Sequence, residues 1–261
     1  MSAAGPKAYR IGLMATCLVD LFRPSVGFAA VKLLEDAGCT VEVPDQTCCG
    51  QPAFNNGDRT HARDLALQVI KAFEGYDYVV APSGSCAGTM AKHYPEMFEG
   101  DPELQRRARA FSAKCFELVS FLTDVMGVTR VDASFPHKVT YHDSCSGLRE
   151  MGVQAQPRKL LSTVDGLELV EMKDADVCCG FGGTFAVKFG EISAKIVERK
   201  TEDIIAAEAP VLLAGDLGCL MNMAGRLSRQ GREMEVRHVA EVLANMTGEA
   251  PPIGEPAEGP K

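Results

Sequence analysis

Eight of the ten cysteines in this chain belong to two copies of one spacing, placed half a chain apart. In each copy, a single cysteine is followed by an adjacent Cys-Cys pair and then by a fourth cysteine. The two copies are Cys17, Cys48, Cys49 and Cys86, and Cys145, Cys178, Cys179 and Cys219. Because thiolates are soft ligands, four of them per copy predict a site for an iron–sulfur cluster or for zinc. Cys39 and Cys115 lie outside the pattern, and we expect no ligand role for them.

The sequence around these cysteines repeats as well. Each adjacent pair is followed by a glycine, Gly50 or Gly180, and an apolar run precedes the first and the fourth cysteine of each copy. Corresponding cysteines are separated by 128, 130 and 133 residues, so the halves differ only by short insertions. This regularity predicts an internal duplication. We expect two similar domains, at residues 8–127 and 137–247, and a disordered tail rich in Pro, Gly and Glu at 248–261.

The elements that position the cysteines follow from the hydrophobic pattern. Short β-branched runs alternate with longer segments of helical spacing, an order typical of parallel sheets in α/β proteins. The predicted strands are Arg10–Ala15, Thr40–Val43, Tyr78–Ala81, Lys138–Tyr141, Leu167–Glu171 and Val211–Ala214. The predicted helices are Val26–Ala37, Arg59–Glu74, Phe111–Met126, Pro157–Ser162 and Ile192–Ala207. The predicted fold is therefore α/β, with a small parallel sheet and its crossover helices in each half, and with the halves related by a pseudo-twofold axis.

Each motif cysteine comes shortly after a predicted strand. The strands of a parallel sheet all end at the same edge, where α/β proteins bind ligands. The segments between successive cysteines are long enough for one crossover helix with its loops. We therefore expect the four thiols of each half to converge at one edge of its sheet, and the two edges to face a shared interface.

Composition argues against two classes of function. The net charge of −8 offers no electrostatic basis for binding nucleic acid. No segment approaches the roughly 18 consecutive apolar residues of a membrane-spanning helix. Met1–Lys7 lack the charged and apolar segments of a secretory signal, so we expect a cytoplasmic protein whose cysteines stay reduced.

Other interpretations of the cysteines remain open. Structural zinc sites also use four thiolates, but usually from short Cys-x-x-Cys pairs, which are absent from this sequence. Each adjacent pair could close a vicinal disulfide for thiol chemistry, but that ring is strained and leaves Cys17 and Cys86 without a role. Buried structural thiols are common singly and improbable as a duplicated set of eight. The favoured prediction is an iron–sulfur cluster of the four-iron type, up to one in each half.

The motif and its flanking residues resemble the CCG (cysteine-rich) domain family of iron–sulfur oxidoreductases. That family includes the cysteine-rich subunit of heterodisulfide reductase, the iron–sulfur subunit of glycolate oxidase and proteins of lactate utilization. The resemblance covers roughly residues 8–247 and is clearest in Met14–Asp20, Cys48–Gly57 and Cys178–Phe185. It is closest to the lactate utilization members, because no ferredoxin-like Cys-x-x-Cys-x-x-Cys module is attached.

This resemblance implies an iron–sulfur electron-transfer subunit that works with LutB-like and LutC-like subunits to oxidise L-lactate to pyruvate. The eight motif cysteines would be the cluster ligands. The heterodisulfide reductase member has a further cysteine in each half and a non-cubane four-iron cluster, whereas this chain has Thr89 and Asn222 at those positions. The cluster geometry therefore stays open. The alternative hypotheses are a stand-alone, cluster-dependent thiol or disulfide reductase and a zinc-bound interaction module.

His142 and Asp143 lie just before Cys145, at the end of a predicted strand. They could hydrogen-bond a cluster sulfur or carry a proton near the second site, and they could equally be satisfied structural groups. The segment 180–184 is glycine-rich but lacks the spacing of a dinucleotide-binding loop. Without a flavin or nicotinamide site, two-electron oxidation of a substrate would need a partner subunit or the cluster itself.

Overall fold

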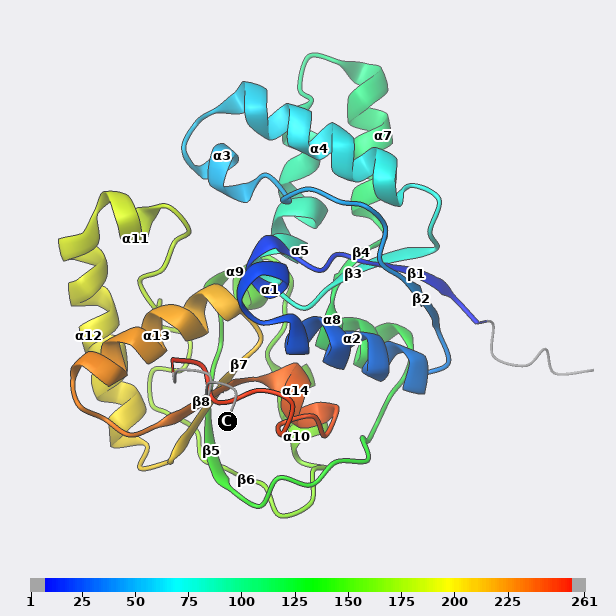
Figure 1. Cartoon of the computed structure of the whole chain (residues 1–261). Helices are drawn as coiled ribbons and strands as arrows, with labels where there is room; N and C mark the ends of the chain where they lie inside the picture. The colour runs from blue at the N-terminus through cyan, green and yellow to red at the C-terminus, as the bar shows by residue number, and fades with distance from the viewer. Residues whose placement is uncertain (1–7, 255–261) are drawn as a thin grey trace, which may run out of the picture.

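The computed structural model describes residues 8–254, which form two four-stranded parallel sheets (Figure 1). The first sheet has the order β2-β1-β3-β4 and consists of β1 (Arg10–Leu13), β2 (Thr40–Glu42), β3 (Tyr78–Ala81) and β4 (Cys115–Glu117). The second has the order β6-β5-β7-β8 and consists of β5 (Lys138–His142), β6 (Glu168–Leu169), β7 (Val211–Ala214) and β8 (Glu235–His238). The identical strand orders confirm the predicted α/β fold with a duplicated sheet.

The strand register aligns the two halves residue by residue. Ile11 of β1 pairs with Tyr78 of β3, and Val139 of β5 pairs with Val211 of β7 in the same parallel arrangement. Equivalent strand residues are separated by the same numbers of residues as the corresponding cysteines: 128 between β1 and β5, and 133 between β3 and β7. The repeat in the sequence is therefore also a repeat of backbone positions.

Helices connect the strands in both halves. The first half contains α1 (Cys17–Phe22), α2 (Pro24–Asp36), α3 (Gln51–Asn55), α4 (Arg59–Phe73), α5 (Gly84–Gly88), α6 (Tyr94–Met97), α7 (Pro102–Ser112) and α8 (Leu118–Ser120), with π-helical turns at Thr89–His93 and Phe121–Val125. The second half contains α9 (Cys145–Arg149), α10 (Ala155–Leu161), α11 (Phe185–Lys188), α12 (Gly190–Ala206), α13 (Leu217–Arg229) and α14 (Val239–Leu243).

The long crossover helices α4 and α12 bury equivalent faces. Asp58 caps α4 by accepting a hydrogen bond from the His61 amide, and α4 then packs one side against the first sheet. The buried positions of α4 are Ala62, Ala66, Val69, Ile70 and Phe73, and those of α12 are Ser193, Val197, Lys200, Thr201 and Ile204. The two sets have the same helical spacing, a constant 131 residues apart, which matches one face of an α-helix.

Reciprocal contacts between helices relate the halves by a pseudo-twofold axis. Helix α5 packs on α9, and its equivalent α13 packs on α1. In the same way α2 packs on α14, side by side in Figure 1, and α10 packs on α8. One hydrophobic core therefore crosses from half to half, with Leu34 and Leu118 from the first and Leu160 and Leu243 from the second. Burial of such side chains, each stabilising by about 1.5–3 kcal/mol, makes the two sheets one folding unit.

Two strands of the structure are missing from the sequence-based expectations. The prediction of one helix over residues 111–126 is wrong, because Cys115–Glu117 pairs with β3 as the edge strand β4, and a helix begins only at Leu118. The strand β8, Glu235–His238, was not predicted, because Glu235 and Arg237 interrupt any apolar run. Both are edge strands whose conformation depends on pairing with the central strand of their sheet.

The segment that was expected to be disordered begins with packed residues. Ile253 donates its amide to the Val236 carbonyl at 2.8 Å and packs against the core of the second half. Arg23 donates to the Pro251 carbonyl, and Arg237 donates to the Ala250 carbonyl at 2.9 Å. The packed chain thus continues at least to Gly254. Residues 255–261 of the expected tail, and residues 1–7, lie outside the described part of the chain.

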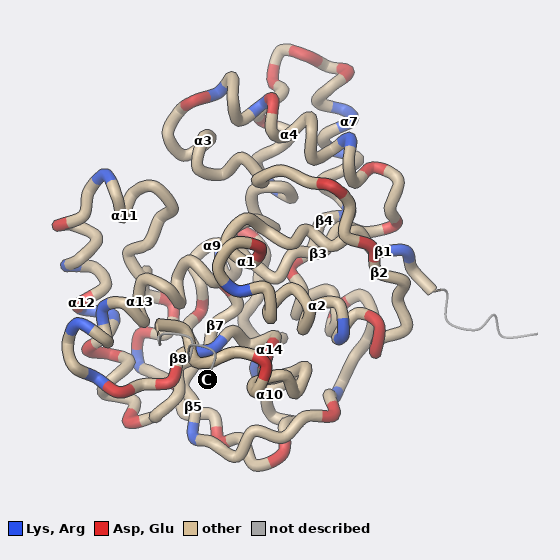
Figure 2. Tube along the Cα trace, in the orientation of Figure 1, with Lys and Arg blue, Asp and Glu red and all other residues tan. Residues whose placement is uncertain are grey.

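Charged residues of both signs are interleaved over the outer helices and loops (Figure 2). Several of them form exposed pairs within a helix, such as Lys32 with Asp36 and Arg106 with Glu103. Between residues 8 and 254, no helix is both long and apolar enough to cross a membrane.

Candidate metal centres at the sheet edges

The four cysteines of the first half come together where the strands of the first sheet end. Cys17 begins α1 after β1, Cys48 and Cys49 lie in the loop after β2, and Cys86 lies in α5 after β3. The Sγ atoms of Cys49 and Cys86 are 3.4 Å apart. Cys48 is hydrogen-bonded to both Cys17 and Cys49, so the four thiols form one continuous chain of contacts. Helical crossovers between parallel strands produce this convergence of residues that are far apart in sequence.

One thiol in the middle of this chain accepts hydrogen bonds from its neighbours. Hydrogen bonds from Cys17 and Cys49, with a further contribution from the Gly50 amide, hold the pKa of the Cys48 thiol far below its usual range. The hydrogen bond to Cys48, together with burial, raises the pKa of Cys17. The hydrogen bonds therefore favour deprotonation of Cys48 over deprotonation of Cys17. A bound metal would take the place of the thiol protons, because metals bind the deprotonated ligand.

The second half repeats this arrangement. Cys145 begins α9, Cys178 and Cys179 lie in the loop after β6, and Cys219 lies in α13. Hydrogen bonds from Cys145 and Cys179 lower the pKa of Cys178, and the Gly180 amide donates to the Cys178 Sγ at 3.3 Å. All eight motif cysteines are therefore grouped into two sets of four, hereafter the first and second cysteine sets.

The glycine after each Cys-Cys pair has a conformation that requires glycine. Gly50 has φ 84° and Gly180 has φ 80°, in the left-handed region. A Cβ at Gly180 would also lie 2.8 Å from the Ser193 carbonyl oxygen, whereas one at Gly50 would lie 3.4 Å from the Leu65 Cβ. This turn directs the two adjacent cysteines into the site and lets the following helix pack closely against them.

Cys39 and Cys115, the two cysteines outside the motif, contact other partners than the motif thiols. The Cys39 Sγ is 3.7 Å from the Met126 sulfur within the core. Cys115 is a buried residue of β4, and its thiol donates to the Phe111 carbonyl at 3.4 Å. Burial raises the pKa of both thiols, which keeps them protonated.

A cavity of about 260 Å³ lies in front of the first cysteine set and between the halves. Cys17, Cys48, Cys49 and Cys86 line one side of it. The other side comes from the second half, from the loop after the Cys178–Cys179 pair and from the start of α13. The first set therefore faces the interface between the halves, as predicted, whereas no cysteine of the second set lines this cavity.

Hydrogen bonds across this interface join the two motif loops. Asn56, just after α3, accepts from Thr184 Oγ1 at 2.9 Å and from Lys188 Nζ at 2.8 Å. On the first-half side of the cavity, Gln51 donates to the Ser85 carbonyl at 3.3 Å. The loop after each Cys-Cys pair is therefore held in place by residues outside its own strand–loop–helix unit.

Thr89 and Asn222, at the positions of the additional cysteines in the heterodisulfide reductase member, bind backbone carbonyls. Thr89 Oγ1 donates to the Ser85 carbonyl at 2.9 Å. Asn222 Nδ2 donates to the Cys179 carbonyl at 2.9 Å, as the Tyr94 hydroxyl does to the Cys49 carbonyl in the first half. These side chains hold the ligand-bearing backbone rather than adding a thiol.

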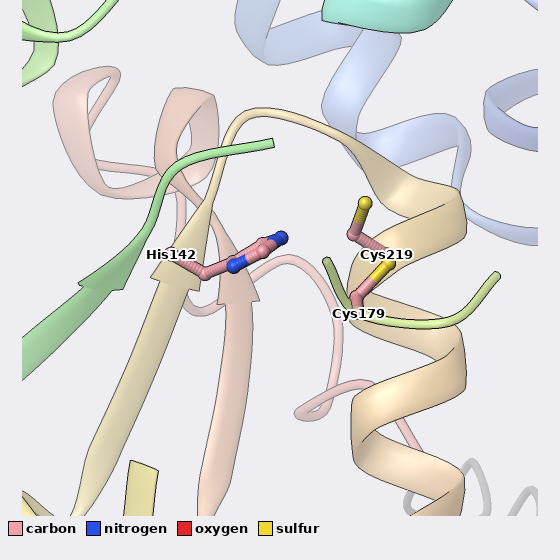
Figure 3. A group of neighbouring side chains, drawn as sticks. All are labelled: His142, Cys179 and Cys219. Atoms are coloured by element: carbon pink, nitrogen blue, oxygen red, sulfur yellow. The ribbon is translucent and has the colours of Figure 1, made fainter. Parts of the chain in front are cut away.

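His142 and Asp143 have different surroundings, although they are adjacent in sequence. Asp143 forms a bidentate ion pair with Arg158, at 2.8 and 3.0 Å, so both of its carboxylate oxygens are hydrogen-bonded. The His142 ring points toward Cys179 and Cys219, and its ligand atom and their two Sγ atoms all lie within 4.8 Å of one another (Figure 3). His142 belongs to the second site, whereas Asp143 supports it from outside.

Lys200 is a site residue that was not predicted from the sequence. It is fully buried on α12, donates to the Asp174 carbonyl at 2.5 Å and lies 3.6 Å from Asp203. Its charge acts on the second site, because it adds to the effect of burial in lowering the pKa of His142. The signal in the sequence was that this lysine occupies a position where the helical pattern expects an apolar residue.

Comparison with known proteins places this chain in a family. A model of the cysteine-rich CCG domain matches residues 11–91 and 139–224. Lactate utilization protein A of Geobacillus sp. (strain WCH70) is 49% identical over 235 residues, 90% of this chain and 98% of that protein. The same-named protein of Geobacillus kaustophilus is 50% identical with the same coverage, and that of Exiguobacterium sp. is 48% identical over 89% of this chain and 96% of the relative.

The fold also resembles that of a solved structure, a hypothetical protein from Helicobacter pylori. The TM-score is 0.58 at 11% identity, with 91% of this chain and 49% of that chain covered. At this identity the likeness extends to the fold alone.

Proposed function

Because this chain belongs to the family of the lactate utilization A proteins and has two CCG domains, we propose that it is the iron–sulfur electron-transfer subunit of a complex that oxidises L-lactate to pyruvate. The proposed partners are LutB-like and LutC-like subunits in the cytoplasm. The names of the relatives support lactate as the substrate of the whole system.

The convergence of four thiols at the carboxyl edge of each sheet supports this function most directly. The donors fit an iron–sulfur cluster in three respects: they are soft sulfur ligands, hydrogen bonds lower the pKa of one thiol in each set, and backbone amides approach the sulfurs. Cys17, Cys48, Cys49 and Cys86 would hold one cluster, and Cys145, Cys178, Cys179 and Cys219 the other. A bound cluster would supply one-electron transfer.

The cavity beside the first set is not built for a hydroxy acid. Among the described residues that line it, the one charged side chain is Asp216, whose carboxylate would repel the carboxylate of lactate. Recognition of such an anion normally uses an arginine or lysine. We therefore assign lactate binding to a partner subunit, and electron transfer to this chain.

Exposed apolar residues around Cys17 support contact with that partner. Cys17 itself is exposed. Leu21 and Val43 line the surface depression on one side of it and are 71% and 54% exposed. Val187, 86% exposed, lines the cavity on the other side. Apolar side chains exposed together commonly mark protein–protein contacts. An iron–sulfur partner seated there would lie next to the first cysteine set.

The cavity also favours one second candidate, a cluster-dependent thiol or disulfide reductase. Its walls are mostly apolar, and Cys17 and Cys48 reach it from the side. A small disulfide could meet the first set there. Reduction of a disulfide by the isolated, reconstituted chain, lost in Cys17→Ser, would favour this function over electron transfer to a partner.

Metal analysis tests the main proposal. Protein purified without oxygen should be brown and contain iron and acid-labile sulfide. Cys49→Ser and Cys179→Ser should each remove about half of the iron, because each disrupts one set, and Cys39→Ala is the matched control that should retain all of it. Lactate-dependent reduction of an acceptor should require the partner subunits. Colourless protein that binds only zinc after reconstitution, or lactate oxidation by the isolated chain, would contradict the proposal.

A further inference from the structure

The two cysteine sets are not chemically equivalent. The register of the central strands makes Met14, which follows β1, the counterpart of His142, which ends β5. Both side chains are fully buried beside their cysteines. The first half thus has a weakly coordinating thioether at the position where the second half has an imidazole, a common metal ligand.

The His142 ring has the surroundings of a ligand rather than of a core histidine. Both ring nitrogens are buried, and neither has a hydrogen-bond partner among residues 8–254. Buried polar groups are nearly always satisfied, so an orphaned pair requires an explanation. The ring lies in the group formed with Cys179 and Cys219, which also contribute buried sulfurs (Figure 3). A metal or cluster between them would satisfy one nitrogen.

A backbone carbonyl also lies near the ring. The Ala175 carbonyl, which accepts from the Asp143 amide at 3.0 Å, approaches His142 without forming a hydrogen bond to it. Metal-bound histidines commonly direct one nitrogen at the metal and the other at such a carbonyl.

We propose that His142 is a ring-nitrogen ligand of the group bound by the second cysteine set, which makes that site a mixed thiolate–imidazole centre and the first site an all-thiolate centre. The inference rests on the proposed function, because it presupposes that the second set binds iron.

A second difference between the halves also lies beside the second cysteine set, and it bears on the reduction potential of that site. Lys200 on α12 and Val69 on α4 occupy equivalent positions on the buried faces of the two helices. The second site therefore has a buried lysine and an imidazole at the two positions where the first site has Val69 and Met14. A nearby positive charge stabilises the reduced cluster, because reduction adds an electron to the site. The second site should consequently have the higher reduction potential of the two.

The test uses full-length protein reconstituted with iron and sulfide, with the first set disabled by Cys49→Ser so that one centre is observed. Chain labelled with ¹⁵N-histidine is compared with unlabelled chain by pulsed paramagnetic resonance of the reduced state. We expect a strongly coupled histidine nitrogen in the parent and its loss in His142→Cys, which retains the iron. His137→Gln, at an exposed histidine, is the control that should retain the coupling.

A redox titration provides the second readout. His142→Cys should lower the midpoint potential of the second site, because an anionic thiolate replaces a neutral ring. Lys200→Met should also lower it while leaving the nitrogen coupling intact. A cluster with no strongly coupled nitrogen, or with a coupling that survives in His142→Cys, would overturn the ligand assignment and leave the electron-transfer function standing. A parent protein that assembles no cluster at all would overturn both.

Discussion

Ser83 and Asp216 occupy equivalent positions, two residues beyond β3 and β7, and they are hydrogen-bonded to each other across the pseudo-twofold interface. Ser83 Oγ donates to Asp216 Oδ2 at 3.0 Å, and the Ser85 amide donates to the same oxygen at 3.0 Å. An acid of the second half thus caps α5, the helix that carries Cys86 of the first set. The geometry of one cysteine set depends in this way on the other half of the molecule.

Removal of this acceptor should destabilise the whole protein. We expect Asp216→Ala to lower the free energy of unfolding by about 2–4 kcal/mol, because one buried and one partly buried donor lose a charged partner. Urea denaturation would measure the change. Asp216→Asn keeps one acceptor oxygen and should cost less. Equal stability of Asp216→Ala and the parent would show that water replaces the carboxylate without loss.

The glycines after the two Cys-Cys pairs offer a matched comparison. Both have positive φ, so alanine should cost about 1–2 kcal/mol at either position. Gly180→Ala should cost clearly more than Gly50→Ala, because its Cβ would lie only 2.8 Å from a backbone oxygen. It should also reduce iron binding by the second set. Thermal unfolding of the two variants, with iron analysis, measures both effects, and equal losses would contradict this account.

A buried ion pair joins the halves on the other side of the interface. Arg23, before α2, donates to Glu241 of α14 at 2.8 and 3.2 Å, and Ser25 donates to the same carboxylate at 2.7 Å. Glu241→Ala should cost about 3–5 kcal/mol, because it leaves a buried guanidinium unpaired. The double variant Arg23→Met, Glu241→Ala should be more stable than the sum of the single changes predicts. Strict additivity in urea denaturation would exclude coupling between the two residues.

The buried carboxyl group of Glu117 at the end of β4 should make stability depend on pH. Burial raises its pKa from 4.5 to about 7, against the opposing hydrogen bond from the Ser120 amide. The native state therefore binds the proton more tightly than the unfolded state, and stability falls as the pH rises from about 4.5 through about 7. The loss amounts to about 3 kcal/mol at pH 8.

Glu117→Gln should remove this dependence, since the amide stays neutral and its oxygen can still accept from Ser120. The variant should gain stability over the parent at pH 8 and little at pH 4.5. Glu168→Gln, at an exposed glutamate of β6, is the control that should follow the parent. Urea denaturation at both pH values measures the difference, and parallel pH profiles of the parent and Glu117→Gln would refute the assignment.

The apolar surface beside Cys17 should be needed for activity with the partner subunits but not for iron binding by this chain. Val187→Asp should retain all iron, because the side chain is 86% exposed, and should reduce partner-dependent lactate oxidation by at least about tenfold if a charge is buried in the contact. Ser162→Asp adds the same charge at the exposed end of α10 and serves as the control. Undiminished activity of Val187→Asp would move the partner contact to another surface.

Much of the fold could be predicted because its signals are local. The strands Tyr78–Ala81 and Val211–Ala214 have the predicted bounds, since each is a short apolar run buried on both faces of a parallel sheet. The spacing of the cysteines indicated both the duplication and the strand ends from which the thiols converge. The edge strands β4 and β8 were missed, because they are short, mixed in polarity and stabilised mainly by pairing.

The sequence by itself therefore determined the two sets of thiols, the duplication and the class of fold, all of which follow from residue identity and spacing along the chain. The tertiary structure alone decided which neighbours each cysteine set has. It brought His142 and Lys200 to the second set and placed Asp216 beside the first. It also formed the cavity between the two halves. These contacts join residues from different elements, and for Asp216 from different halves, so their geometry arises only when the two sheets pack against each other.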